Sequence, residues 1–267
     1  MTSYPWGSAL VTGASSGIGE AMVRRLGGAG VPTVAVARRA DRLAALAAEV
    51  PGVEVLVADL FTADGLARVG ERLTDAARPV DLLVNNAGFG HSGAFVDVTI
   101  DASVGQVELN ITALVHLSRV ALPGMIVRGH GGVLNVSSVA SFQPAPYGAV
   151  YAATKAFVTS FTEALHEELR ATGLTATVLC PGYTRTEFMA VSGSASDAAD
   201  LPAFAWLTAD QVAADGLAAA AAGRALVVPG PQYKAFVAVS GLVPRAFKRR
   251  VAGMVGRRSN GTSNRRS

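Results

Sequence analysis

The stretch "ALVTGASSGIGE", residues 9–20, joins a short apolar run to a turn with glycines at positions 13, 17 and 19. A glycine-rich turn after a buried strand lets backbone N–H groups approach a pyrophosphate, and a helix that starts there offers its positive N-terminus. The spacing differs from the common G-x-G-x-x-G fingerprint. The stretch therefore indicates a nucleotide site, and a purely structural tight turn is the alternative.

The same alternation of short apolar runs and helical segments continues along the chain. Six runs of this kind precede residue 181: 9–13, 32–38, 53–59, 81–86, 132–138 and 175–180. Segments such as "ADRLAALAAEV" lie between them, with apolar residues at helical spacing. Strands with little polar alternation are typical of a parallel sheet covered on both faces. We expect an α/β fold with a doubly wound parallel sheet (Rossmann fold), helices on both faces and about seven strands, the last at "ALVVPG", residues 225–230.

Length and composition fit one large domain. The 267 residues are 50% hydrophobic and 16% charged, which allows a sizeable core. We expect a catalytic domain over 1–230, a helical extension over 231–256 and a basic, disordered tail over 257–267. With no secretory signal and no apolar run of membrane-spanning length, a cytoplasmic location is expected. The single cysteine, Cys180, fits a reducing compartment and a small core residue.

Two arginines end the second predicted strand. Enzymes that select NAD place an acid there for the ribose 2′-hydroxyl, whereas this chain has Arg38 and Arg39. A guanidinium suits a phosphate, and an acid would repel one. The pattern favours NADP(H) over NAD(H); the alternative is that both arginines open a solvated helix face.

With these motifs the chain resembles the short-chain dehydrogenase/reductase family, from residue 7 to about 230. Seven matching elements follow in order: "TGASSGIG", "ADL", "NNAG", "LNITA", "NVSS", "YAATK" and "PGYTRTEF". The resemblance implies an NAD(P)-dependent oxidoreductase acting on a carbonyl or alcohol. It places Asn110, Ser138, Tyr151 and Lys155 at the catalytic positions. Ser138 is preferred to Ser137 because it lies at the family's usual interval of 13 residues before the tyrosine.

The pair Tyr151 and Lys155 stands one helical turn apart, which brings both side chains to one face. A phenol with a pKa near 10 is a poor base at neutral pH. A cation at about 4 Å is worth up to roughly 4 kcal/mol, so Lys155 is expected to lower the Tyr151 pKa by as much as roughly three units. Ser138 would hold the substrate oxygen. The alternative is a buried tyrosine beside a surface lysine.

The resemblance also implies which residues hold the cofactor. Lys155 would contact the nicotinamide ribose, and Asn110 would anchor a water that relays protons. Thr186 has an alternative role as a helix cap. The implied cofactor-binding residues are Gly13, Ser15, Ser16, Gly17, Ile18, Gly19, Arg38, Arg39, Asp59, Leu60, Asn86, Ala87, Gly88, Tyr151, Lys155, Pro181, Gly182, Thr184 and Thr186.

The substrate is not identified by the sequence. His91 is a candidate for the pocket border, and the histidines show no metal-ligand spacing, so no metal is expected. Segment 189–207 lies where the family keeps its substrate-covering loop, and we expect it to be mobile without ligand. The aromatic and polar residues flanking the catalytic motifs could line the pocket or simply pack: Phe142, Gln143, Tyr147 and Phe188.

Two other function classes share parts of this sequence pattern. A redox sensor that binds NADP(H) without turnover would have no need of Ser138, Tyr151 and Lys155 together. A methyltransferase could share the sheet and the first turn, but it would normally carry an acid where Arg38 stands.

A homo-oligomer, either a dimer or a tetramer, is expected.

The end of the chain is basic. Residues 216–267 hold ten Lys or Arg and no Asp or Glu. Around Pro244, which predicts two short helices, apolar residues mix with Arg245, Lys248, Arg249 and Arg250. Such a segment could lie on an anionic membrane and suit a lipid-like substrate. The favoured alternative packs its apolar residues on the domain or on a second subunit; these are Phe236, Val239, Leu242 and Phe247. Nucleic acid is not expected.

Overall fold

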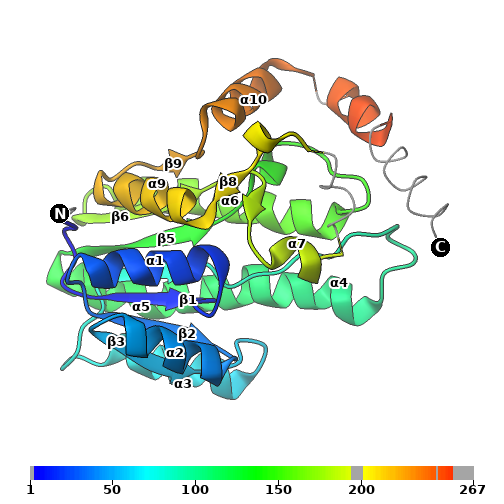
Figure 1. The fold of residues 1–267 in the computed structure, drawn as a ribbon. Coiled ribbons are helices and arrows are strands. Elements are labelled where there is room, and N and C mark those ends of the chain that lie inside the picture. Colours follow the sequence, from blue (N-terminus) through cyan, green and yellow to red (C-terminus); the bar gives the residue numbers. More distant parts are fainter. Residues whose placement is uncertain (1–2, 194–200, 245, 255–267) are drawn as a thin grey trace.

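The computed structural model describes residues 3–193, 201–244 and 246–254. Within them, seven strands form one parallel sheet in the order β3-β2-β1-β4-β5-β6-β9 (Figure 1). The strands are β1 Ala9–Thr12, β2 Thr33–Ala37, β3 Val53–Val57, β4 Leu82–Asn85, β5 Gly131–Val136, β6 Leu174–Leu179 and β9 Leu226–Val227. The doubly wound Rossmann fold expected from the sequence is confirmed, including its seventh strand.

The strand order reverses between β1 and β4. Ala9 of β1 pairs with Thr33 of β2 on one side and with Leu82 of β4 on the other. The chain therefore leaves β1 in one direction and returns to its opposite side after β3. In an open parallel sheet this switch point opens a crevice at the carboxyl ends of the strands.

Helices cover both faces of the sheet. Helix α1 packs beside α9, and α3 packs beside α5. The helices are α1 Gly17–Gly28, α2 Ala40–Glu49, α3 Ala63–Thr74, α4 Ile100–Val107, α5 Leu114–Arg128, α6 Ala149–Leu169, α7 Phe188–Val191, α9 Ala209–Ala221 and α10 Pro231–Leu242. Short elements near the crevice are the π-helix η1 Glu108–Ala113, the 3₁₀ turns η2 Val139–Phe142 and η3 Ala203–Ala205, and the two-stranded pair β7 Thr184–Arg185 and β8 Leu207–Thr208.

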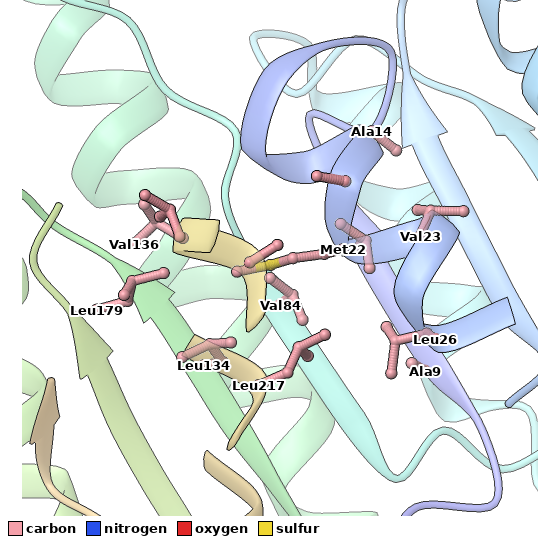
Figure 2. Close-up of a cluster of buried hydrophobic side chains, with 14 of the residues drawn as sticks. Ala9, Ala14, Met22, Val23, Leu26, Val84, Leu134, Val136, Leu179 and Leu217 are labelled. Carbon is pink, nitrogen blue, oxygen red and sulfur yellow. The ribbon is translucent and has the colours of Figure 1, made fainter. Parts of the chain in front are cut away.

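Alternate strand residues supply two cores, because successive side chains point to opposite faces. Figure 2 shows Met22 and Leu26 of α1 with Leu217 of α9 over Val84 and Leu134 of the sheet. The second core joins the other strand residues to α3 and α5; it includes Leu10, Leu83, Val133, Val69 and Leu117. Burial on both faces fixes the sheet and so fixes the crevice.

Helix α4, η1 and helix α5 follow one another as one long helical run, Ile100–Arg128. Among the described residues, Ile100–Arg128 is long and apolar enough to cross a membrane by length and composition alone. Its residues Leu117, Ala121 and Met125 are buried against the sheet. Packing on the core therefore accounts for its apolar character.

The C-terminal extension lies beyond β9. Helix α10 and a second helix over 246–254 stand on either side of Pro244, in agreement with the two short helices expected. Both lie at the edge of the molecule in Figure 1. Ser240 donates a hydrogen bond to the Phe142 carbonyl at 3.4 Å, which ties α10 to η2. The tail expected over 257–267 falls outside the described residues.

Candidate active site

The glycine-rich loop follows β1 and leads into α1. Gly13 and Gly17 have φ of +67° and +59°, a region that favours glycine. A Cβ on Gly19 would lie 2.4 Å from the Gly13 carbonyl oxygen. The loop can thus close tightly at the start of α1, where Ile18 packs against the core. All three glycines are required by the backbone.

The segment after β4 is bonded to this loop. The Asn86 side chain donates to the Thr12 carbonyl at 2.9 Å and to the Gly13 carbonyl at 3.3 Å. The Thr12 hydroxyl accepts from the backbone N–H groups of Asn86 and Ala87, each at 3.0 Å. Gly88 continues toward the catalytic residues, because a Cβ there would lie 2.8 Å from Asn110 Oδ1. The "NNAG" motif therefore links the two halves of the crevice.

Arg39 turns into the glycine loop. Its Nε and Nη2 donate to the Ser15 hydroxyl at 3.0 and 2.9 Å, and Nη2 also donates to the Ser16 hydroxyl at 2.8 Å. Its Nη1 bonds Glu187 Oε2 at 2.8 Å, and Arg42 bonds the other oxygen, Oε1, at 2.6 Å. These two arginines hold the pKa of the Glu187 carboxyl at about 2. We call the donor set of Ser15, Ser16, Arg39 and Arg42 the arginine cradle.

Arg38 points elsewhere. Its guanidinium lies 5.8 Å from the centroid of the Phe61 ring and 4.0 Å from Asp59 Oδ2, and its side chain is 65% exposed. Asp59 also accepts from the Phe61 N–H at 3.1 Å, while Leu60 is buried beside it. Arg38, Asp59 and Leu60 therefore lie together at the ends of β2 and β3, on the side expected for the adenine.

The catalytic candidates meet where β5 ends and α6 begins. Ser138 is the N-cap of η2 and accepts from the Ala140 N–H at 3.1 Å. A hydrogen bond joins its side chain to that of Tyr151 on α6. The Tyr151 ring packs on Phe188 of α7, with centroids 5.5 Å apart. The Tyr151 phenol and the Ser138 hydroxyl thus lie side by side at the carboxyl edge of the sheet.

Lys155 is buried one turn along α6. Its Nζ donates to the Val136 carbonyl at 2.9 Å and lies 5.8 Å from the centroid of the Tyr151 ring. The Ser137 hydroxyl donates to the Lys155 carbonyl at 2.8 Å, which holds this turn of α6 against β5. The alternative of a surface lysine is therefore wrong.

The expected lowering of the Tyr151 pKa is also wrong for the ligand-free protein. Burial raises the Tyr151 pKa to about 12, and the bond from Ser138 offsets only part of that rise. Burial also lowers the pKa of Lys155 to about 8. Burial thus disfavours the charged forms of both side chains, the phenolate of Tyr151 and the ammonium of Lys155. At neutral pH Tyr151 is protonated and can act as a proton donor.

Asn110 lies in the π-helix η1 between α4 and α5. Its side chain donates to the Phe89 carbonyl at 2.9 Å and to the Thr154 hydroxyl at 3.0 Å, and it accepts from the Phe89 N–H at 3.0 Å. Single π-helical turns are frequent at functional sites. Here the turn brings Asn110 beside α6, within reach of the Lys155 end of the site. Its expected role in anchoring a water stays a prediction.

The segment after β6 forms the facing wall. The Thr186 side chain lies against the glycine loop, because a Cβ on Gly17 would be 3.0 Å from Thr186 Cγ2. Its hydroxyl accepts from the Phe188 N–H at 3.3 Å, so it also helps to start α7. Pro181 and Gly182 follow β6, and Thr184 bonds the Gly182 carbonyl at 2.9 Å. Part of the covering segment 189–207, residues 194–200, falls outside the described residues.

Pocket candidates separate into two groups. His91 and Tyr147 line a small cavity with Phe95, Gln106 and Val150. Tyr147 has φ of +66°, a strained conformation for a tyrosine, and it lines this cavity. Phe188 packs on Tyr151, whereas Phe142 packs on the core and its carbonyl meets α10, beside Gln143. In the described parts of the chain no group of three or more His, Cys, Asp or Glu is placed to hold a metal.

Four residues near the site had no role in the sequence reasoning. Arg42 and Glu187 form the ion pair at the cradle, and Ser137 holds Lys155. Tyr233 of α10 lies over Gly182, where a Cβ would be 2.1 Å from the ring. Of these four residues, only Arg42 could have been found from the sequence, because it stands at helical spacing from Arg39. The other three depend on contacts between distant segments.

A Rossmann-type sheet with a glycine-rich loop after its first strand and a Ser–Tyr–Lys group at its carboxyl edge defines a class of oxidoreductases, and comparison with known proteins gives the family. Residues 8–197 match the family model described as short chain dehydrogenase. The chain belongs to the short chain dehydrogenase family, as the resemblance implied.

Three relatives show how far the similarity extends. A short chain dehydrogenase of Pseudocercospora fijiensis is 35% identical over 201 residues, which is 73% of this chain and 65% of that protein. Serine 3-dehydrogenase of Agrobacterium fabrum is 37% identical over 197 residues, 73% of this chain and 79% of that one. A short-chain dehydrogenase of Sphingobium yanoikuyae, solved in complex with NADPH, has a TM-score of 0.78 and 34% identity over 88% of this chain and 94% of that chain.

Proposed function

We propose that the protein is an oxidoreductase that transfers a hydride between NADP(H) and a carbonyl or alcohol substrate, with Tyr151 as acid/base. The observation that carries the proposal is the meeting of Ser138, Tyr151 and Lys155 at the carboxyl ends of β4 and β5, against the segment that bonds the glycine loop. Similar chains were solved with NADPH or NADP⁺, among them those of Sphingobium yanoikuyae and a serine dehydrogenase.

The site fits a dinucleotide carrying an extra phosphate. The glycine loop leaves no room for side chains, which suits close approach of a pyrophosphate to its N–H groups. The Glu187 carboxylate already occupies the arginine cradle and stands in there for an anion. We assign the pyrophosphate to the loop at Gly13–Gly19, the 2′-phosphate to the cradle and the nicotinamide side to Lys155 and Thr186.

The chain's own residues then perform the proton transfer. Bound nicotinamide would supply or accept the hydride. The Ser138 hydroxyl donates a hydrogen bond to the substrate oxygen and fixes its position. Tyr151 gives its proton to that oxygen as the carbonyl carbon is reduced, and it takes the proton back when an alcohol is oxidised. A Tyr151 pKa of about 12 keeps the phenol protonated at neutral pH, as the role of proton donor requires.

Turnover of NADPH with a panel of ketones, aldehydes, quinones and acyl thioesters tests this proposal. We expect oxidation of NADPH with at least one carbonyl class. Tight NADPH binding without turnover of any of these would instead favour the redox sensor.

Cofactor choice gives a sharper prediction, in which the two adjacent arginines separate. Arg39→Asp is expected to weaken NADPH binding about 10- to 150-fold, because charge-assisted bonds to a phosphate contribute about 1.5–3 kcal/mol. Its effect on NADH should be small. Arg38→Asp should act in the same direction but less, since Arg38 lies outside the cradle over Phe61. Fluorescence titration of both variants with NADPH and NADH measures this, and equal losses for the two cofactors would exclude a 2′-phosphate site at Arg39.

We also propose that the C-terminal extension contacts an anionic membrane surface, which would suit a lipid-like substrate. The described single chain leaves Val239, Leu242 and Phe247 exposed, at 61%, 86% and 61% of their surface. These three therefore do not pack on the catalytic domain in the described single chain, whereas Phe236, the fourth residue of this expectation, is 38% exposed. A second subunit remains the alternative cover. Apolar side chains beside Arg249 and Arg250, in a region without acidic residues, complement anionic headgroups.

Vesicle sedimentation tests the membrane contact. A chain ending at Gly230 would also lose Tyr233, which lies over Gly182, so substitutions in the full chain are cleaner. The native chain is expected to pellet with anionic vesicles at low salt. Arg249→Glu with Arg250→Glu should weaken vesicle binding at least about 30-fold, because two basic residues at about 1 kcal/mol each contribute about 2 kcal/mol. Neutral vesicles are the control. Equal pelleting of the native and substituted chains, or none, would reject the membrane, and light scattering would then test a homo-oligomer.

A further inference from the structure

We propose that Glu187 occupies the 2′-phosphate subsite in the free enzyme and competes with NADP(H) for it. This inference rests on the proposed function, because it takes the arginine cradle to be that subsite. It assigns Glu187, which lies in the "PGYTRTEF" motif but had no role in the expected site, as a residue that sets cofactor affinity. It also links cofactor binding to the segment that faces the active site.

The first step is the occupancy of the cradle. Both carboxylate oxygens of Glu187 are engaged, Oε2 by Arg39 at 2.8 Å and Oε1 by Arg42 at 2.6 Å. The same Arg39 fork also donates to the Ser15 and Ser16 hydroxyls. An incoming phosphate needs the guanidinium edge that the carboxylate already holds, and two anions on one arginine repel each other.

The second step is the origin of the carboxylate. Glu187 comes from the far side of the crevice, 148 residues beyond Arg39, and is the N-cap residue of α7. It contributes no side-chain cap bond to that helix, so its carboxylate is committed to the arginines. The ion pair therefore joins the end of β2 to α7, across the start of α1.

The third step is what α7 carries. Phe188, the next residue, packs on the ring of Tyr151 with centroids 5.5 Å apart. Thr186, the residue before, touches the glycine loop at Gly17. When a phosphate displaces Glu187, the contact that holds this segment to the cradle is lost. Binding of the cofactor thus frees the wall on which the acid/base residue rests.

The size of the effect follows from competition. Glu187 is 44% exposed and its arginine partners are 41% and 45% exposed, so water screens the contacts. If the cradle is free in about a third to a tenth of molecules, the apparent Kd for a phosphate ligand rises about three- to tenfold. Removing the carboxylate charge should therefore lower the apparent Kd by the same three- to tenfold factor.

The experiment uses 2′,5′-ADP, which carries the 2′-phosphate without the nicotinamide, and 5′-AMP, which lacks it. Calorimetric titration of Glu187→Gln is expected to show about three- to tenfold tighter binding of 2′,5′-ADP and unchanged binding of 5′-AMP. Glu49→Gln is the matched control, because Glu49 is also an exposed carboxylate paired with an arginine, Arg24, away from the cradle. It should leave both ligands unchanged.

A second readout follows α7 itself. Amide hydrogen exchange over 188–191 should speed up in the native protein on adding 2′,5′-ADP, and should already be fast in Glu187→Gln without ligand. Weaker or unchanged binding of 2′,5′-ADP by Glu187→Gln would overturn the competition and show that Glu187 only holds the arginines in place. Equal affinity of the native protein for 2′,5′-ADP and 5′-AMP would instead contradict the NADP(H) preference in the proposed function.

Discussion

Replacement of Tyr151 by phenylalanine is expected to lower turnover by about 10²- to 10⁴-fold, the usual contribution of a positioned general acid. The ring and its contact with Phe188 are kept, so the fold of the site should survive. NADPH affinity should stay nearly unchanged, because the hydroxyl acts in the transition state. Steady-state kinetics with the identified carbonyl substrate, together with an NADPH titration, measure both parts.

Tyr147→Phe is a suitable control for this result. It removes a hydroxyl from the neighbouring pocket, four residues earlier in the chain, and we expect it to change KM more than kcat. If Tyr151→Phe retained near-native turnover, the proton would have to come from another group. Ser138, which is bonded to the phenol, would be the first to examine.

Lys155→Met is expected to separate activity from stability. Activity should fall by about 10²- to 10³-fold, as for loss of one fixed donor at a developing charge. The ligand-free protein, however, should become more stable. Burial lowers the Lys155 pKa from 10.5 to about 8, a cost of about 3 kcal/mol for the charged form. Loss of the bond to the Val136 carbonyl destabilises the variant by about 1 kcal/mol. The net gain in the free energy of unfolding is therefore about 2 kcal/mol.

The pH dependence gives this prediction its sign. The folded-state pKa of Lys155 is depressed, so between pH 8 and 10.5 the unfolded chain binds more protons than the native one. Stability of the native protein should therefore rise with pH through this window, apart from other groups. The advantage of Lys155→Met should be full below pH 8 and should vanish near pH 10. Above about pH 10.5 the variant should be less stable by about 1 kcal/mol, because only the lost bond to the Val136 carbonyl then counts. Urea unfolding at several pH values measures it, and an advantage that does not change with pH would show that Lys155 is not buried with its charge.

The same group should govern cofactor binding. The profile of kcat/KM for NADPH reports ionisations of the free enzyme. Because Lys155 loses its charge near pH 8, this profile is expected to fall above that pH for reduction.

Most of the fold was predictable from sequence, because strands covered on both faces leave continuous apolar runs. All seven strands lie where such runs were found, and the glycine loop follows the first. The site was predictable wherever a residue lies directly after a strand, as Ser138 follows β5. Carboxyl ends of parallel strands meet at one edge, so order along the chain was enough to bring these residues together.

The expectations that failed depended on where a side chain points and on how deeply it is buried. The adjacent side chains of Arg38 and Arg39 diverge, so that the first lies on Phe61 and the second in the glycine loop. Glu187 meets Arg39 across 148 residues, a distance no local pattern spans. The expected shift of the Tyr151 pKa had the wrong sign. The sequence shows that a lysine stands near the tyrosine, but it does not show that burial removes water from both side chains.

Tyr233 makes the C-terminal extension part of the wall that follows β6. Its hydroxyl accepts from the Tyr183 N–H at 3.0 Å and donates to the Ala205 carbonyl at 2.5 Å, while its ring fills the space over Gly182. When residue 233 is aromatic, residue 182 must be glycine, because the ring leaves no room for a Cβ. Chimeras that borrow a C-terminal segment from a relative must therefore inherit a compatible pair at 182 and 233, and an exchange at one position alone would disrupt the joint between extension and wall.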